Sequence, residues 1–203
     1  GVNYSEFTDT HKAKIRAHYC GLIAQIDHMV GEILQALRDT GQLDNTVILF
    51  ASDHGDYLGD HNLIGKGSFF EASCHVPLIA RVPGQEGGRE NDALVALADI
   101  MPSMVHFAGC PVPEYIDFQP LPGLGLSESN PRNHLFGMMA GGWMVFDGRY
   151  KLCKYSSREN MLFDLQEDPR EIDNLIRTEH QVHDRLDAVL TREIMRSVLA
   201  ARQ

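Results

Sequence analysis

The chain is poor in cysteine and has no long hydrophobic run, and each absence excludes a class of protein. Four cysteines are scattered over 203 residues with no close pair, a spacing that matches neither a disulfide framework nor a zinc site. No apolar stretch approaches the roughly eighteen residues of a membrane-spanning helix. We therefore expect a domain held by a hydrophobic core, with no membrane span.

Positive charge is scarce as well. The chain has 18 lysines and arginines against 28 aspartates and glutamates, which gives a formal net charge of -10. This balance disfavours nucleic acid and anionic membranes as partners. A hydrophobic content of 43% is ordinary for a globular domain, and a chain of this length buries about 70% of its unfolded surface.

The most informative segment is an apolar run that leads directly into an acid, an imidazole and a glycine. Val47–Ala51 precedes Ser52, Asp53, His54 and Gly55. Such a run is typical of a strand buried on both faces of a parallel sheet, and ligands gather at the carboxyl ends of such strands. We expect Gly55 to let the backbone turn sharply there. A carboxylate beside an imidazole makes two credible ligands for one divalent cation.

A lysine follows on a glycine-rich loop. Lys66 lies between Gly65 and Gly67 and could bring a cation to an anionic substrate at the same edge of the sheet. Structural alternatives exist for all three candidates. Asp53 could cap the turn after the strand, His54 could be a buried histidine satisfied by backbone groups, and Lys66 could be a solvated surface lysine.

These motifs resemble the sulfatase family of the alkaline-phosphatase-like hydrolases. The family pattern is Ser-Asp-His-Gly-Asp/Glu, Leu-Gly-Asp/Glu-His and Gly-Lys, and it is matched here by Ser52–Asp56, Leu58–His61 and Gly65–Gly67. The resemblance covers most of the chain but only the later part of such an enzyme. It continues in Phe69–Glu71, Val76–Ile79, Tyr150–Leu152, Leu162–Leu165, Glu167–Pro169, Glu171 and Asn174–Leu175.

The resemblance implies roles for specific residues. Asp53 and His54 would be metal ligands, and Lys66 would be a catalytic residue that contacts a sulfate oxygen. His61 could line the substrate pocket, although a surface histidine is an equal alternative. The expected metal is Ca²⁺. Mn²⁺ is an alternative because imidazole is softer than calcium prefers, and Mg²⁺ is a further alternative. The expected substrate is a small-molecule or carbohydrate sulfate ester.

The family's nucleophile is missing from these residues. It is a formylglycine made from the first residue of Cys/Ser-x-Pro-x-Arg. Cys110 is followed by Pro111, Val112, Pro113 and Glu114, so proline is one place off and arginine is absent, and no other cysteine or serine offers the motif. We expect formylglycine and further metal ligands in an N-terminal half that acts as partner, and this chain alone to be inactive.

Two other functions stay open. Phosphonate monoester and phosphodiester hydrolases of the same superfamily share the Asp-His-Gly pattern. The chain could also be a catalytically inactive domain used for binding or assembly.

The hydrophobic periodicity predicts an α/β fold, in which part of a mostly parallel sheet is flanked by helices. A small antiparallel sheet with a C-terminal helix follows. We place the first unit at residues 1–125 and the second at 126–203. The expected elements of the first unit are a helix at 9–38, strands at 46–52, 76–82 and 94–97, and a helix at 100–108 capped by Asp99.

A proline-rich connection at 110–133 separates the two units. In the second unit, 143–146 and 150–155 read as a hairpin around Asp147-Gly148, the sequence of a type I′ turn. A strand at 161–165 and a helix at 180–199 complete it. We expect Glu71 to anchor the Lys66 loop, His75 to make a structural hydrogen bond, Lys151 to serve packing and turns, and Trp143 to lie in the core.

Overall fold

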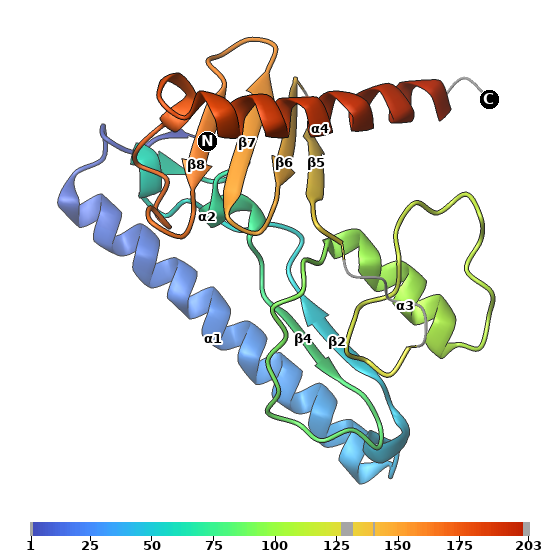
Figure 1. The fold of residues 1–203 in the computed structure, drawn as a ribbon. Coiled ribbons are helices and arrows are strands. Elements are labelled where there is room, and N and C mark those ends of the chain that lie inside the picture. Colours follow the sequence, from blue (N-terminus) through green and yellow to red (C-terminus); the bar gives the residue numbers. More distant parts are fainter. Residues whose placement is uncertain (1, 127–131, 140, 201–203) are drawn as a thin grey trace.

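The computed structural model describes residues 2–126, 132–139 and 141–200. Its main parts are one long helix beside a pair of strands, and a four-stranded sheet crossed by the C-terminal helix (Figure 1). In the proline-rich connection, residues 110–126 and 132–133 contain no helix or strand, whereas 127–131 lie outside the described residues. Among the described residues, no helix combines the length and the apolar character needed to cross a membrane.

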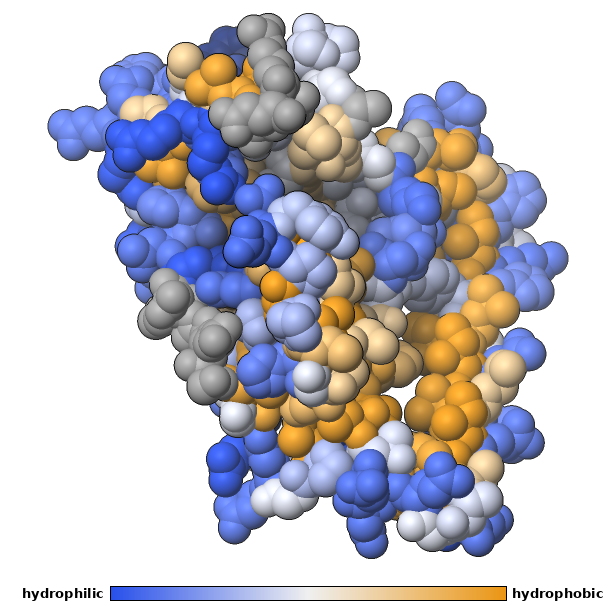
Figure 2. Space-filling view, turned by 90° about the vertical axis from the view of Figure 1, so that its right-hand side faces the viewer, coloured by the Kyte–Doolittle hydropathy of each residue, from blue (hydrophilic) through white to orange (hydrophobic). Residues whose placement is uncertain are grey.

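The long helix α1 (Asp9–Asp39) forms where the sequence predicts it. It begins after Thr8, whose hydroxyl oxygen accepts a hydrogen bond from the backbone N–H of His11, as an N-cap residue does. None of its residues is buried. Its apolar face includes Leu22 and Ile33, which are 58% and 61% exposed. Figure 2 is turned about the vertical axis, so heights in it match those in Figure 1. It shows apolar side chains gathered at the level of α1 and of the strand pair β2–β4.

The strand pair corrects one prediction. Strand β2 (Ile48–Ala51) pairs with β4 (Leu78–Arg81) in antiparallel register, with Leu49 opposite Ala80. The short strands β1 (Val2–Asn3) and β3 (Leu63–Ile64) also pair antiparallel. Every strand pair of the described residues is antiparallel, so the expected mostly parallel sheet is not found there.

The apolar run at β2 is also less buried than predicted. All four of its residues are only half-buried, and the one strand paired with β2 in the described part is β4. An apolar run specifies an extended segment that needs covering, but it does not specify the direction or the number of its neighbours. The strand expected at 94–97 is not formed; Leu97–Asp99 is a turn of 3₁₀ helix instead.

Helix α3 (Ile100–Phe107) follows that turn, and its place agrees with the prediction. Asp99 stands at the predicted N-cap position of α3, but its side chain makes no capping hydrogen bond there. The carboxylate is buried and accepts a hydrogen bond from the backbone N–H of Ala96 at 2.8 Å. It also forms an ion pair with Arg132 at 2.9 Å. Asp99 therefore ties the connecting segment to α3.

The C-terminal antiparallel sheet and helix form as predicted, but the sheet contains a fourth strand, at residues 135–139, that was not predicted. Strands β5 (Leu135–Met139), β6 (Gly142–Phe146), β7 (Tyr150–Tyr155) and β8 (Met161–Asp164) make an antiparallel sheet in that order. Helix α4 (His180–Ala200) crosses it (Figure 1). Val145, Leu152 and Leu162 lie opposite one another in the register, and with Leu186 and Leu190 of α4 they form the buried core. Burial of each such side chain stabilises the fold by about 2 kcal/mol.

The hairpin between β6 and β7 is confirmed, but its turn differs from the predicted type I′. A type I′ turn needs positive φ at both central residues. Gly148 has a φ of +95°, whereas Asp147, the other predicted central residue, is not among the residues with positive φ. The carboxylate of Asp147 accepts hydrogen bonds from the backbone N–H groups of Arg149 and Tyr150, and this contact holds the turn in its different form.

Candidate functional site

Three residues singled out in the sequence lie together just after β2. The imidazole Nε2 of His54 lies 3.2 Å from Oδ2 of Asp53. The ammonium nitrogen of Lys66 contacts the same Nε2. The side chains of Asp53 and His54 are 80% and 38% exposed, so the cluster is open to solvent on the surface of the described residues.

The backbone fixes the orientation of the His54 ring. Its Nδ1 lies 2.8 Å from the carbonyl oxygen of Gly55. A carbonyl oxygen can only accept a hydrogen bond, so in the neutral ring Nδ1 carries the proton. Nε2 then directs its lone pair toward Asp53 and Lys66. A hydrogen bond to the remote ring nitrogen orients metal-binding histidines in the same way.

Asp53 is held in its charged form. Partial desolvation acts to raise the pKa of its carboxyl group. The backbone N–H of His54, which donates to Oδ1 at 3.0 Å, and the positive charge of Lys66 act in the opposite direction and lower the pKa overall. The carboxylate is therefore available as an anionic ligand at neutral pH.

This pair fits part of a metal shell. One carboxylate oxygen and one imidazole nitrogen lie at a separation that a single cation can span, because such ligands bind divalent ions at roughly 2.0–2.6 Å. In the described part of the chain, no group of three or more His, Cys, Asp or Glu residues could hold a metal ion. Asp53 and His54 therefore fit a site that further ligands must complete.

The short helix α2 (Glu71–Cys74) supports both loops of the cluster. The N–H of Gly55 donates to the carbonyl oxygen of Ser73 at 2.9 Å. The N–H of Gly67 donates to the hydroxyl oxygen of Ser73 at 3.5 Å. A Cβ on Gly55 would lie 2.1 Å from the carbonyl oxygen of Ala72. Glycine is needed there for close approach, and not for the sharp turn predicted, because Gly55 has no positive φ.

The loop between the motifs is closed by its own residues. The Asp56 carboxylate accepts hydrogen bonds from the backbone N–H groups of Leu58 and Gly65 at 2.9 and 3.1 Å. The buried Tyr57 donates from its hydroxyl to Ser68 at 2.6 Å. These contacts were not foreseen from the sequence. They return the chain so that Lys66 meets His54.

His61 lies in different surroundings. Its ring stacks on Phe70 at a centroid distance of 3.6 Å, and its φ of +53° is rare for a residue with a side chain. With Arg170 it lines a cavity of about 210 Å³. The other lining residues are Gly59, Asp60, Asn62 and Ile172.

Lys151 is a charged residue whose importance the sequence analysis missed. It is 1% exposed, and its Nζ lies 2.6 Å from Glu71 and 2.7 Å from Glu171. Glu71 therefore anchors α2 through Lys151, and also accepts from His75 at 2.7 Å, the structural bond expected of that histidine. The feature of the sequence that could have indicated a buried, ion-paired lysine is its position between apolar residues on a predicted strand.

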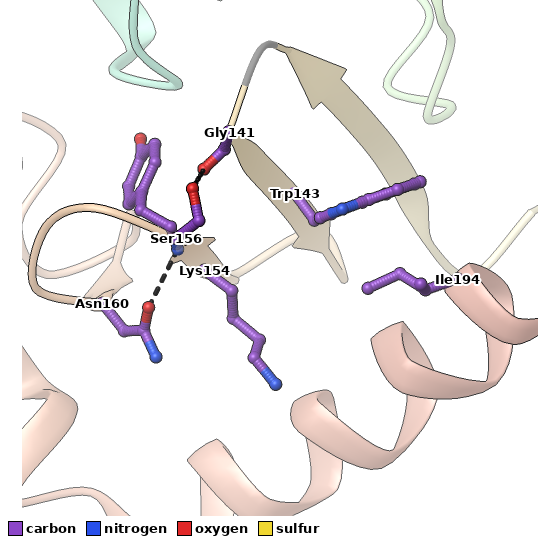
Figure 3. A pocket seen from close by; sticks show the side chains of 7 residues that line it. Gly141, Trp143, Lys154, Ser156, Asn160 and Ile194 are labelled. Atoms are coloured by element: carbon purple, nitrogen blue, oxygen red, sulfur yellow. Dashed lines mark hydrogen bonds between the residues drawn. The ribbon is translucent and has the colours of Figure 1, made fainter.

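A larger cavity lies apart from these residues, beside α4. It has a volume of about 300 Å³. Figure 3 shows Trp143 and Ile194 on facing elements and the Lys154 side chain extending toward α4. Trp143, predicted to be core, packs against the core and also lines this cavity. The remaining lining residues are Gly141, Tyr155, Ser156 and Asn160.

Comparisons with known proteins cover both parts of the chain. The family model described as Sulfatase matches residues 2–110, and the model described as N-sulphoglucosamine sulphohydrolase, C-terminal, matches residues 59–198. Arylsulfatase of Clostridium perfringens is 37% identical over 86% of this chain and 38% of its own length. Arylsulfatase K of Bos taurus is 32% identical over 91% of this chain and 37% of its own length.

Solved structures agree in fold. The phosphonate monoester hydrolase of Agrobacterium radiobacter superimposes with a TM-score of 0.79 at 31% identity, over 95% of this chain and 43% of that one. The chain therefore spans less than half the length of each of these proteins.

Proposed function

Because the chain belongs to the sulfatase family, we propose that it supplies metal ligands and a substrate-binding lysine to a hydrolase of sulfuric esters. The observation that carries this proposal is the meeting of Asp53, His54 and Lys66 at the end of β2. The carboxylate of Asp53 and the imidazole nitrogen of His54 suit a metal ion, and the ammonium group of Lys66 beside them suits an anionic ester.

In this proposal Asp53 and His54 bind one divalent cation, Ca²⁺ in the first place and Mn²⁺ or Mg²⁺ as alternatives. The Asp53 carboxylate contributes charge, which hard cations prefer. His54 contributes Nε2, whose orientation the Gly55 carbonyl fixes. When bound, such a cation holds a nucleophile and polarises an ester oxygen. The remaining ligands and the formylglycine nucleophile come from polypeptide outside these 203 residues.

Lys66 is the proposed catalytic residue of this chain. Its ammonium group contacts one sulfate oxygen, and it offsets the negative charge that builds on the sulfate and leaving oxygens in the transition state. The hydrogen bond from Gly67 to Ser73 holds the loop that carries it. The position of Lys66 beside His54 brings this positive charge to the metal-binding residues.

His61 is proposed to contact the substrate farther from the reacting bond. It lines the 210 Å³ cavity together with Arg170. A guanidinium group recognises sulfate and carboxylate groups, and Asp60 in the same lining can accept hydrogen bonds from hydroxyl groups. These groups suit a small-molecule or carbohydrate sulfate ester.

A phosphonate monoester or phosphodiester hydrolase is the second candidate. The likeness to the Agrobacterium radiobacter enzyme at 31% identity favours it. A tetrahedral phosphorus centre presents the same anionic oxygens to the cation and to Lys66. A catalytically inactive binding or assembly domain is the alternative if no nucleophile accompanies the chain.

The test uses the enzyme that comprises this chain and the nucleophile-bearing part. Turnover of 4-nitrophenyl sulfate is compared with that of a 4-nitrophenyl phosphonate monoester. Asp53→Asn and Lys66→Met should each lower kcat/KM by about 10²–10³-fold. Asp44→Asn, at a fully exposed carboxylate, should leave it unchanged. A higher kcat/KM for the phosphonate ester would select the second candidate. Equal rates in all variants would overturn both.

A further inference from the structure

A buried cluster of charges joins the C-terminal sheet to α2. Lys151 lies on β7, on the face opposite Leu152, and is 1% exposed. Its ammonium group forms ion pairs with Glu71 at 2.6 Å and with Glu171 at 2.7 Å. The second carboxylate oxygen of Glu171 accepts a hydrogen bond from the backbone N–H of Glu71 at 2.7 Å. Each of the three residues thus contacts the other two, with Glu171 reaching Glu71 through the latter's backbone N–H.

The same helix holds the two loops of the candidate site. Ser73 accepts hydrogen bonds from Gly55, next to His54, and from Gly67, next to Lys66. The Ala72 carbonyl oxygen occupies the space that a Cβ on Gly55 would need, so Gly55 packs directly against α2. A displacement of α2 therefore reaches both loops at once.

We propose that Lys151 is a positioning residue, which holds α2 against the C-terminal sheet and thereby sets His54 and Lys66 in place. This inference rests on the proposed function of those two residues. Lys151 acts through Glu71 and Glu171, and it does not touch the substrate.

The energetics favour a positioning role over a purely stabilising one. A buried ion pair is often no more stabilising than apolar residues of the same volume, because desolvation of the charges offsets their attraction. Directed ion pairs restrict geometry more than apolar contacts do. Glu171 also has a φ of +56° and is 3% exposed. A strained backbone persists where the surroundings over-determine it.

Glu71 and Lys151 keep their charges at neutral pH, whereas burial raises the pKa of Glu171. Burial acts to raise the pKa of Glu71, but the hydrogen bond with His75 and the ammonium group of Lys151 outweigh it and hold that pKa at about 2. Burial acts to lower the pKa of Lys151, and its acidic neighbours raise it overall. Glu71 and Lys151 therefore form a true ion pair.

The test measures amide hydrogen exchange of this chain by NMR. Lys151→Met should accelerate exchange of the Gly55 and Gly67 amides on the order of tenfold through local opening, with the amides of α4 unchanged. Arg149→Met is the matched control, because it breaks the ion pair with Asp164 without touching α2. It should leave Gly55 and Gly67 unchanged.

A second variant keeps the test decisive if Lys151→Met does not fold. Glu71→Gln removes the ion pair between α2 and Lys151 but leaves Lys151 paired with Glu171, and it should also accelerate exchange at Gly55 and Gly67. Unchanged exchange at both glycines in the folded variants would overturn the inference. In the enzyme, Lys151→Met should lower kcat more than it raises KM. Inactivity of every form of the enzyme would count against the proposed function and leave the exchange result standing.

Discussion

Replacement of Gly55 by alanine should push the His54 loop away from α2. The added Cβ would lie 2.1 Å from the carbonyl oxygen of Ala72 and 3.1 Å from its carbon. Ordinary contact begins at 3.4 Å, so the two backbones must separate by about 1.3 Å (3.4 minus 2.1). Neither partner is a flexible side chain that could rotate aside.

The cost of Gly55→Ala follows from these contacts. Overpacking costs about 1–3 kcal/mol, and loss of the Gly55–Ser73 hydrogen bond adds about 1 kcal/mol. The reduced freedom of the unfolded chain returns about 0.4–1 kcal/mol. We expect the free energy of unfolding to fall by about 2 kcal/mol, measured by urea denaturation with far-UV circular dichroism.

The control for this change is Gly31→Ala in α1, where an added Cβ meets nothing within 4 Å. It should raise the free energy of unfolding by up to about 1 kcal/mol, the difference in helix propensity. If Gly55→Ala proved as stable as the unaltered chain, the close approach to Ala72 would not exist and the account of how α2 supports His54 would be refuted.

Three further predictions concern pH, packing and metal. The pKa of Glu71 in the folded chain, about 2, lies below the ordinary value of 4.5, so the stability that its charge contributes is present above pH 4.5 and is lost as pH falls toward 2. Lowering the pH from about 5 to about 3 should therefore reduce the free energy of unfolding of Glu71→Gln less than that of the unaltered chain, as measured by urea unfolding at each pH. Leu186→Ala, at a fully buried position of α4, should lower the free energy of unfolding by about 2–5 kcal/mol, against less than about 0.5 kcal/mol for Leu199→Ala at 60% exposure. Calorimetry of this chain alone should give a Kd for Ca²⁺ of about 1 mM or weaker, because two ligands rarely hold a hard cation, and micromolar binding would contradict the partial shell.

Local patterns predicted much of the fold. The helices α1 and α4 and the hairpin of β6 and β7 were found correctly, because helix periodicity and turn residues act over a few neighbouring positions. The antiparallel direction of β2 relative to its neighbour was not predicted correctly, because the pairing with β4 depends on tertiary structure and not on nearby residues. An antiparallel partner and a parallel one demand the same apolar run.

For the candidate site, the residues in sequence motifs were predicted, but the contacts that support them were not. The motifs predicted the sulfatase family correctly, and they named Asp53, His54 and Lys66, which the fold brings together. The partners of Lys151 could not be predicted, because Glu71 lies 80 residues away in the sequence. The support of both loops by α2 depends on Ser73, a residue with no chemical signature of its own.

Coordination of the metal by His54 can be measured by electron spin-echo spectroscopy of the Mn²⁺-loaded enzyme. Directly coordinated imidazole gives a characteristic nitrogen modulation. The unaltered enzyme should show this modulation and His54→Gln should lose it. His28→Gln, at an exposed histidine of α1, should keep it. A modulation that survives unchanged in His54→Gln would contradict the assignment of His54 as a metal ligand.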